Sequence, residues 1–130
     1  MPLFAFLLAM PANAAETSAF MVVRDSPLAG FRYNDGRFVW DEMRIGDTLM
    51  LAREPGNPFD TNAIRVEWNG RKIGYVPRQQ NGALARVLDA GAAIEGRIIE
   101  LVKHRNGRHL ISYDLWVPLA TAEHAHGEKR

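Results

Sequence analysis

The amino-acid sequence predicts a mainly β fold with one or two short helices, built as a small antiparallel barrel or a strongly bent sheet. Apolar and polar residues alternate over several short runs, which is typical of strands with one buried face. Short turns join these runs, and Asn69-Gly70 is the strongest of them because both residues tolerate the positive φ of a hairpin turn. No strand–helix–strand repeat is visible, so hairpins are expected to dominate.

Four elements are expected in the first part of the domain. Each rests on apolar spacing or on a turn signal. In order, they are a strand over 19–24 ended by Ser26-Pro27, a short strand over 28–33, a helical turn over 38–45 and a strand over 48–53.

The second part is expected to contain a hairpin, a helix and a second hairpin. The hairpin pairs a strand over 63–68 with a return strand over 72–76, which Pro77 ends. A helix follows over 81–90, with Asn81 as its N-cap and Gly91 in the left-handed position after its end. Two longer strands, 94–103 and 109–117, complete the sheet.

Length and composition indicate one globular domain. The chain has 130 residues, of which 47% are hydrophobic and 24% charged, and it has no cysteine, which excludes disulfides and thiolate chemistry. Net charge is +1, yet residues 71–112 hold eight basic against three acidic residues, a net charge of +5. This uneven distribution is compatible with a polyanionic partner and equally with an ordinary solvated surface.

Residues 1–14 are predicted to be a signal peptide. An apolar run over 3–10 is too short to span a bilayer and precedes Ala12-Asn13-Ala14, a small-x-small site that predicts cleavage after Ala14. No Lys or Arg precedes the run, so a start further upstream and an apolar arm packed on the domain remain alternatives. Export would make the domain, residues 15–118, periplasmic or secreted; otherwise it would be cytoplasmic. Residues 119–130 are predicted to be a disordered polar tail.

A sharp bend at 53–66, "REPGNPFDTNAIRV", gathers polar residues in an unusual density. Turn chemistry explains its prolines, its glycine and an Asx turn at Asp60. It explains less well why Arg53 and Glu54 lead into the bend, where they either pair with each other or face a ligand. Phe59 is left with two roles, a core residue or a ligand contact.

The bend and the residues that follow it resemble the HIRAN domain, a module attached to many helicase-like DNA repair proteins and also found alone in bacteria. The family pattern joins "REP-x-NP-aromatic-D-x-NAI-x-V" to "G-aromatic-V-P-R" and to a helix with "A-x-x-L-D-x-G". The resemblance covers about residues 28–117, and "SPLAGFRYNDG" is similar to the start of bacterial members. The matching stretches are "REPGNPFDTNAIRV" at 53–66, "GYVPR" at 74–78 and "ARVLDAG" at 85–91.

The resemblance implies an OB-like barrel that binds single-stranded DNA, in the best-understood members at a free 3′ end. Carried over, Phe59 would stack on the terminal base, and Asp60 would accept a hydrogen bond from the 3′-hydroxyl. Tyr75 and Arg78 match positions that line the same groove. With Arg53 and Asn57, these four residues make up the candidate nucleic-acid site.

Two departures from the family pattern bear on this site. Phe59 stands where relatives often have Tyr or His, which keeps the stacking ring but loses a polar contact. Where end-binding members have an Arg-Tyr pair before the first glycine, this sequence has Ser26-Pro27-Leu28, which predicts that part of the pocket is missing.

Other functions have less support in the sequence. It carries no nucleotide-binding, serine-hydrolase or metalloprotease motif, so the domain is expected to be no enzyme and to need no metal or cofactor. An exported module that binds a protein or an envelope ligand is the second hypothesis. A metal-dependent hydrolase acting on nucleic acid is the third, and it would have to gather carboxylates from Asp41, Glu42, Asp47, Glu54 and Asp60.

Overall fold

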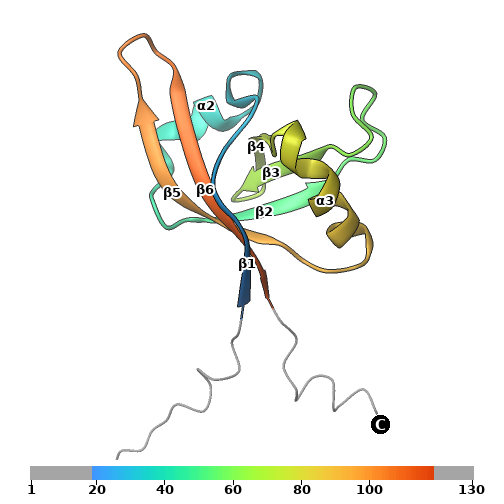
Figure 1. Ribbon diagram of the computed structural model, residues 1–130. Helices are drawn as coiled ribbons and strands as arrows, with labels where there is room; N and C mark the ends of the chain where they lie inside the picture. The colour runs from blue at the N-terminus through green and yellow to red at the C-terminus, as the bar shows by residue number, and fades with distance from the viewer. Residues whose placement is uncertain (1–18, 119–130) are drawn as a thin grey trace, which may run out of the picture.

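The computed structural model describes residues 19–118 as one six-stranded antiparallel sheet with short helices (Figure 1). The strand order across the sheet is β1-β6-β5-β2-β3-β4. The strands are β1 Ala19–Pro27, β2 Thr48–Arg53, β3 Ile64–Trp68, β4 Arg71–Tyr75, β5 Glu95–Lys103 and β6 His109–Pro118. The helical segments are η1 Phe31–Tyr33, α2 Gly36–Val39, η2 Trp40–Glu42 and α3 Arg78–Asp89. The mainly β prediction is confirmed.

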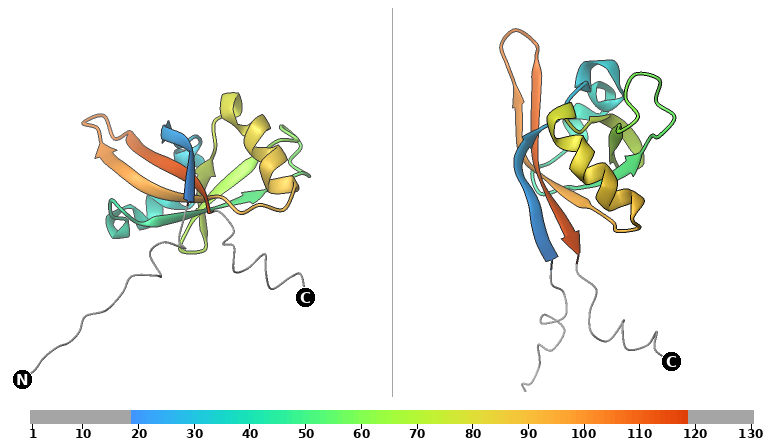
Figure 2. Two further views of the ribbon diagram at one scale, coloured as in Figure 1. Left: turned by 60° about the horizontal axis from the view of Figure 1, so that its bottom comes forward. Right: turned by 45° about the vertical axis from the view of Figure 1, so that its right-hand side comes forward.

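The sheet bends strongly but does not close into a continuous barrel. The long β5–β6 hairpin forms one side, and β2, β3 and β4 with α3 form the other (Figures 1 and 2). The segment just after edge strand β1 meets the other edge strand, β4, through one isolated bridge, in which Ala29 and Tyr75 exchange backbone hydrogen bonds of 2.9 and 2.8 Å. Gly74 makes this approach possible, because a Cβ there would lie 2.4 Å from the carbonyl oxygen of Ala29.

The core fills the inside of the bend. Apolar residues alternate inward along the strands, so that the sequence period of two becomes a buried face. The most deeply buried side chains come from strands throughout the sheet and include Leu49, Ile64, Val66, Ile73, Tyr113 and Leu115. Helix α3 adds Leu84 and Ala85 to this cluster.

The first strand continues through the Ser26-Pro27 pair that was expected to end it. Asp25 has a φ of 54° and lies in an irregular stretch of the β1–β6 pairing, which turns Ser26 inward. The Ser26 hydroxyl donates to Oε1 of Gln80 at 2.8 Å, and this bond ties β1 to α3. Pro27 is tolerated because β1 is an edge strand.

Two further element predictions are wrong in detail. The expected strand over 28–33 is reduced to the single bridge at Ala29, because Gly30 adopts a φ of 74° and the chain then enters η1. Helix α3 starts at Arg78, directly after Pro77, so Asn81 lies inside the helix and is not its N-cap. The predicted hairpin turn is confirmed, with φ of 51° at Asn69 and 83° at Gly70.

Both ends of the described domain lie together. Ala19 of β1 pairs with Pro118 of β6, at the end of the sheet away from the loops that the next section describes (Figure 1). Between residues 19 and 118 no helix is both long and apolar enough to cross a bilayer. The predicted signal peptide (1–14) and polar tail (119–130) lie outside the described residues.

Candidate functional site

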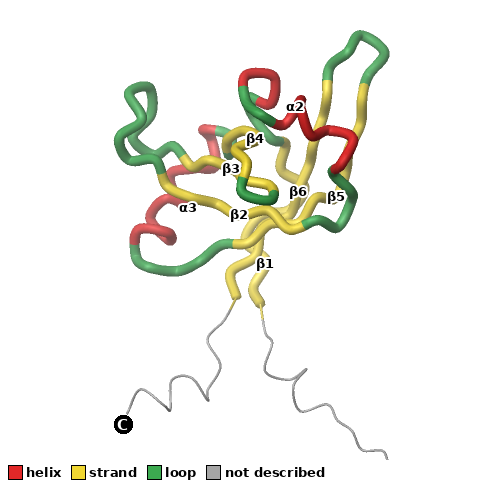
Figure 3. The backbone as a smooth tube through the Cα atoms, turned by 180° about the vertical axis from the view of Figure 1, so that it is seen from behind, coloured by secondary structure: helices red, strands yellow, loops and turns green. Residues whose placement is uncertain are grey.

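Three loops project from the edge of the sheet opposite to Ala19 and Pro118. They are the segment 30–34 around η1, the segment 54–63 between β2 and β3, and the tip 104–108 of the β5–β6 hairpin (Figures 1 and 3). We call this side the loop edge. Segments 29–34 and 57–63, with the end of β4 and the start of α3, surround a cavity of about 580 Å³. Its lining comprises Ala29, Gly30, Tyr33, Asn34, Asn57, Pro58, Phe59, Asp60, Ala63, Tyr75, Val76, Arg78 and Asn81.

Asn57 organises the tip of the 54–63 loop. Its side-chain oxygen Oδ1 accepts hydrogen bonds from the backbone N–H groups of Phe59 at 2.8 Å and of Asp60 at 3.2 Å. This Asx arrangement replaces the strand ladder that the two prolines interrupt. Phe59 is left 82% exposed, so of its two predicted roles the core role is excluded.

Asp60 is held at the cavity wall by both of its carboxylate oxygens. Oδ1 accepts from the backbone N–H of Asn62 at 2.9 Å, which is the expected Asx turn. Oδ2 accepts from Nδ2 of the buried Asn81 at 2.8 Å and lies 3.6 Å from Nε of Arg78. The hydrogen bonds from Asn62 and Asn81 hold the pKa of Asp60 below its usual value. Its side chain is therefore an anion at neutral pH.

Glu54 anchors the same loop to strand β4 of the sheet. Burial would raise the pKa of Glu54, but hydrogen bonds from Tyr75, Asn57 and Lys72 outweigh it and lower the pKa. The Tyr75 hydroxyl donates to Oε1 at 2.8 Å, Nδ2 of Asn57 donates to the same oxygen at 3.1 Å, and Nζ of Lys72 donates to Oε2 at 3.2 Å. Asn57 thus links Glu54 to the backbone of the exposed tip.

Arg53 pairs with a helix and not with Glu54. Its Nε lies 3.0 Å from Oδ1 of Asp89 in α3, and its other nitrogens donate to the carbonyl oxygens of Thr61 and Ala63 at 3.0 and 2.9 Å. The predicted Arg53–Glu54 pair is therefore wrong, because each side chain finds a partner elsewhere in the fold. Arg53 fastens the far side of the loop to α3.

The cavity brings together most of the residues that the sequence singled out. Phe59, Asp60, Tyr75, Arg78 and Asn57 all line it, whereas Arg53 does not.

The sequence reasoning missed Tyr33 as a cavity residue. Tyr33 is 77% exposed, lines the cavity from η1 and carries the guanidinium of Arg32 at 5.2 Å from its ring centre. An Arg-Tyr pair is therefore present after Gly30, with Tyr33 in the cavity lining and Arg32 against its ring, further along the chain than Ser26-Pro27-Leu28. The signal is present in the sequence as "GFRYNDG" at 30–36, shortly after Leu28.

The carboxylates proposed for a hard cation do not gather. Between residues 19 and 118 no group of three or more His, Asp or Glu side chains has a geometry that would hold a metal ion. Each of three of these carboxylates has its own set of protein partners: Glu54 and Asp60 accept the bonds described above, and Asp47 accepts from the indole N–H of Trp68 at 2.9 Å. The metal-dependent hydrolase has no support in this arrangement.

Acid is expected to loosen the loop. The unperturbed pKa values are 4.5 for Glu54 and 3.8 for Asp60, and the folded values lie below them. The unfolded chain therefore takes up protons first, so the stabilisation is complete above about pH 5 and is lost as the pH falls through the lowered folded values. Urea unfolding at decreasing pH measures this loss. A Glu54→Gln variant should lose less stability on acidification than the wild type, and an identical pH profile for the two would contradict the assignment to Glu54.

Comparisons with known proteins agree with this architecture. The HIRAN domain profile matches residues 22–119. The helicase-like transcription factor of Oryctolagus cuniculus is 41% identical over 71 residues, which cover 53% of this chain and 7% of that protein. The chain thus spans a small fraction of such relatives.

Solved structures extend the similarity to the whole domain. A protein from Lactobacillus plantarum is 31% identical with a TM-score of 0.66, over 78% of this chain and 96% of that one. The HIRAN domain of human HLTF is 25% identical with a TM-score of 0.62, over 84% and 85% of the two chains. A solution structure of the HLTF HIRAN domain in its DNA-bound conformation is 24% identical with a TM-score of 0.50, over 89% and 90%.

Proposed function

This chain belongs to the HIRAN domain family, and from that premise we propose that it binds single-stranded DNA at a free 3′ end. The HIRAN domain of HLTF has been solved in a DNA-bound conformation, which makes nucleic acid the first ligand to test here. The proposal covers binding and assigns no catalytic step to the chain.

The observation that carries the proposal is the pairing of an exposed ring with an ionised carboxylate at one cavity. Phe59 is 82% exposed, and Asp60 is the next residue along the chain. An aromatic face stacks on any base and contributes about 1–3 kcal/mol per base. A carboxylate repels phosphate but accepts a hydrogen bond from a hydroxyl. The pair therefore favours a strand terminus with a free hydroxyl over the middle of a strand.

The other cavity residues supply complementary contacts. Arg78 is 71% exposed and donates through Nη2 to the carbonyl of Phe59 at 2.8 Å, which leaves further N–H groups for a phosphate. Tyr33 offers a second ring from η1, so a base can be held between two segments of the chain. Tyr75 lines the floor, while Asn57 and Arg53 keep the loop in place.

Cell location and biological context are separate proposals. If residues 1–14 direct export, the domain would meet DNA released outside the cytoplasm. If they do not, the family resemblance supports a role in DNA repair. If the domain is exported, the competing hypothesis is that the same cavity binds a protein or an envelope ligand. Binding of DNA strands with defined ends tests the DNA hypothesis directly.

The test is fluorescence anisotropy of the purified chain with two short single strands of identical sequence. One ends in a 3′-hydroxyl and the other in a 3′-phosphate. We expect the hydroxyl strand to bind at least about tenfold more tightly, because a charge-assisted hydrogen bond contributes about 1.5–3 kcal/mol. Equal affinity for the two ends would refute end recognition, and no binding of either strand at low salt would refute DNA binding.

A further inference from the structure

A second cavity lies beside the first along the loop edge. It has a volume of about 430 Å³ and is formed between η1 and the β5–β6 hairpin. Gly30 and Tyr33 line both cavities, so the exposed ring of Tyr33 stands between them. Its other lining residues are Leu28, Phe31, Arg32, Asn106, Gly107, Arg108 and His109.

The charge of this second cavity has one sign. Its lining includes Arg32 and Arg108 and no Asp or Glu. Lys103 and Arg105 extend the positive charge along the exposed hairpin. Among the ion pairs between described residues, none involves these four side chains, in contrast to Arg53, Arg65 and Arg78. Their charge is therefore available to a ligand.

The hairpin that carries these charges has a defined shape. The backbone N–H of His104 donates to the carbonyl of Arg108 at 2.7 Å, and that of Arg108 donates to Oδ1 of Asn106 at 2.9 Å. At its base the His109 ring packs 5.0 Å from the Phe31 ring and 4.4 Å from the Trp40 ring, measured between centres. This aromatic cluster fixes the hairpin against η1 and thereby against the first cavity.

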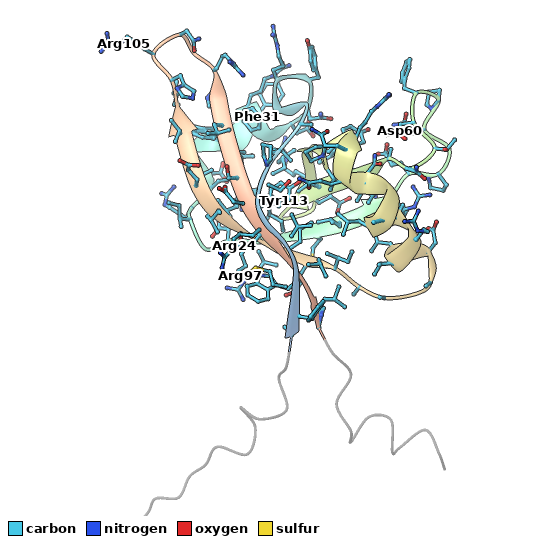
Figure 4. All side chains as sticks on the ribbon, in the orientation of Figure 1. Arg24, Phe31, Asp60, Arg97, Arg105 and Tyr113 are labelled. Atoms are coloured by element: carbon cyan, nitrogen blue, oxygen red, sulfur yellow. The ribbon has the colours of Figure 1, made fainter. Side chains whose placement is uncertain are left out.

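We propose that the second cavity and the basic hairpin 103–108 bind the phosphodiester backbone of the nucleotides that precede the 3′ end. This inference rests on the proposed function, since it extends the strand out of the first cavity. A strand whose terminal base lies between Tyr33 and Phe59 passes the shared ring of Tyr33 into the second cavity. There Arg32 and Arg108 of the lining, together with Arg105 on the adjoining hairpin tip, face its phosphates, and no carboxylate in the lining repels them. Figure 4 shows Arg105 and Asp60 projecting from the same edge of the molecule.

The test measures how the loss of affinity on removing charge depends on the length of the strand. A trinucleotide and a strand of about twelve nucleotides, within the ~4–16 that an OB-type fold occupies, share one 3′-hydroxyl end. The variant is Arg105→Ala/Arg108→Ala. The matched control is Arg24→Ala/Arg97→Ala, which removes the same charge from two exposed arginines toward the opposite end of the sheet (Figure 4). Thermal unfolding establishes that both variants are folded.

We expect the hairpin variant to lose roughly twentyfold in affinity for the long strand at about 0.1 M salt. Two lost phosphate contacts should also reduce the slope of log K against log salt by about 1.4. The affinity of this variant for the trinucleotide should stay unchanged, and so should its preference for a 3′-hydroxyl over a 3′-phosphate. The control should bind both strands as the wild type does.

Several results would overturn the inference. Equal losses in the two variants would mean a non-specific effect of charge, and a loss that occurs only with a long strand annealed to its complement would place duplex, not single strand, on the hairpin. End preference separates this inference from the proposed function. If the hairpin variant weakens long-strand binding although the wild type ignores the 3′ end, phosphate binding by the hairpin is supported, but its placement next to a 3′ end fails together with end recognition. If the wild type prefers the 3′-hydroxyl and the hairpin variant binds the long strand as the wild type does, end recognition stands and this inference is wrong.

Discussion

Replacing Asp60 by asparagine is expected to abolish the preference for a 3′-hydroxyl over a 3′-phosphate. Asparagine keeps the size of the side chain and an oxygen for the backbone N–H of Asn62, but it removes the negative charge. The hydroxyl strand should lose about 10–100-fold in affinity, because a hydrogen bond to a charged acceptor contributes about 1.5–3 kcal/mol. The phosphate strand should gain affinity, since Arg78 no longer has the carboxylate 3.6 Å away.

The same anisotropy measurement with both strands checks this result. Asp41→Asn is the matched control, because it removes one exposed carboxylate from η2, outside both cavity linings. Urea unfolding separates lost binding from lost structure, which matters because the buried Asn81 amide donates to Asp60. If Asp60→Asn still discriminates between the two ends, another group reads the hydroxyl and the role given to Asp60 is wrong.

Gly74→Ala is expected to cause the largest loss of stability of any single methyl added to the sheet. The new Cβ would lie 2.4 Å from the Ala29 carbonyl oxygen and 2.8 Å from Cγ of Leu28. A backbone oxygen cannot move aside without breaking the bridge that joins the two sheet edges. Overpacking of this kind costs about 1–3 kcal/mol, and we expect the upper end, which corresponds to a fall in Tm of roughly 12–24 °C.

Calorimetry or thermal circular dichroism measures the effect. Gly56→Ala is the control, because nothing lies within 4 Å of its added Cβ and the change should leave Tm close to that of the wild type. DNA affinity should fall with Gly74→Ala, since Ala29 and Tyr75 both line the first cavity. An unchanged Tm would show that the bridge opens freely and does not hold the edges together.

Sequence predicted the elements whose signals are local. The strand over 48–53 and the Asn69-Gly70 turn are confirmed because alternation and positive φ are properties of adjacent residues. Five of the six candidate site residues line the first cavity, and they were predicted for a different reason, the resemblance of the stretches 53–66 and 74–78 to one family. Elements that depend on distant partners were missed: the inward turn of Ser26 needs Gln80, and the choice of partners by Arg53 needs Asp89.

The remaining errors concern Asn81 and Tyr33. Asn81 has the residue type of an N-cap, but its amide is used inside the fold, where it is buried and donates to Asp60. Tyr33 ends the run 28–33 that the sequence predicts as a short strand, but the left-handed Gly30 turns the chain into η1 and places Tyr33 at the cavity. Neither outcome follows from spacing alone, since both depend on segments that approach from elsewhere in the chain.

The adjacent ends of β1 and β6 make this domain suited to insertion. Ala19 and Pro118 are paired across one ladder, so the chain enters and leaves the fold within the spacing of neighbouring strands, about 5 Å. A host protein could therefore accept the whole domain within a single surface turn, with little disturbance to the host backbone. Figure 1 places that attachment point opposite the loop edge. Both cavities would therefore face away from the host protein and stay accessible to a ligand.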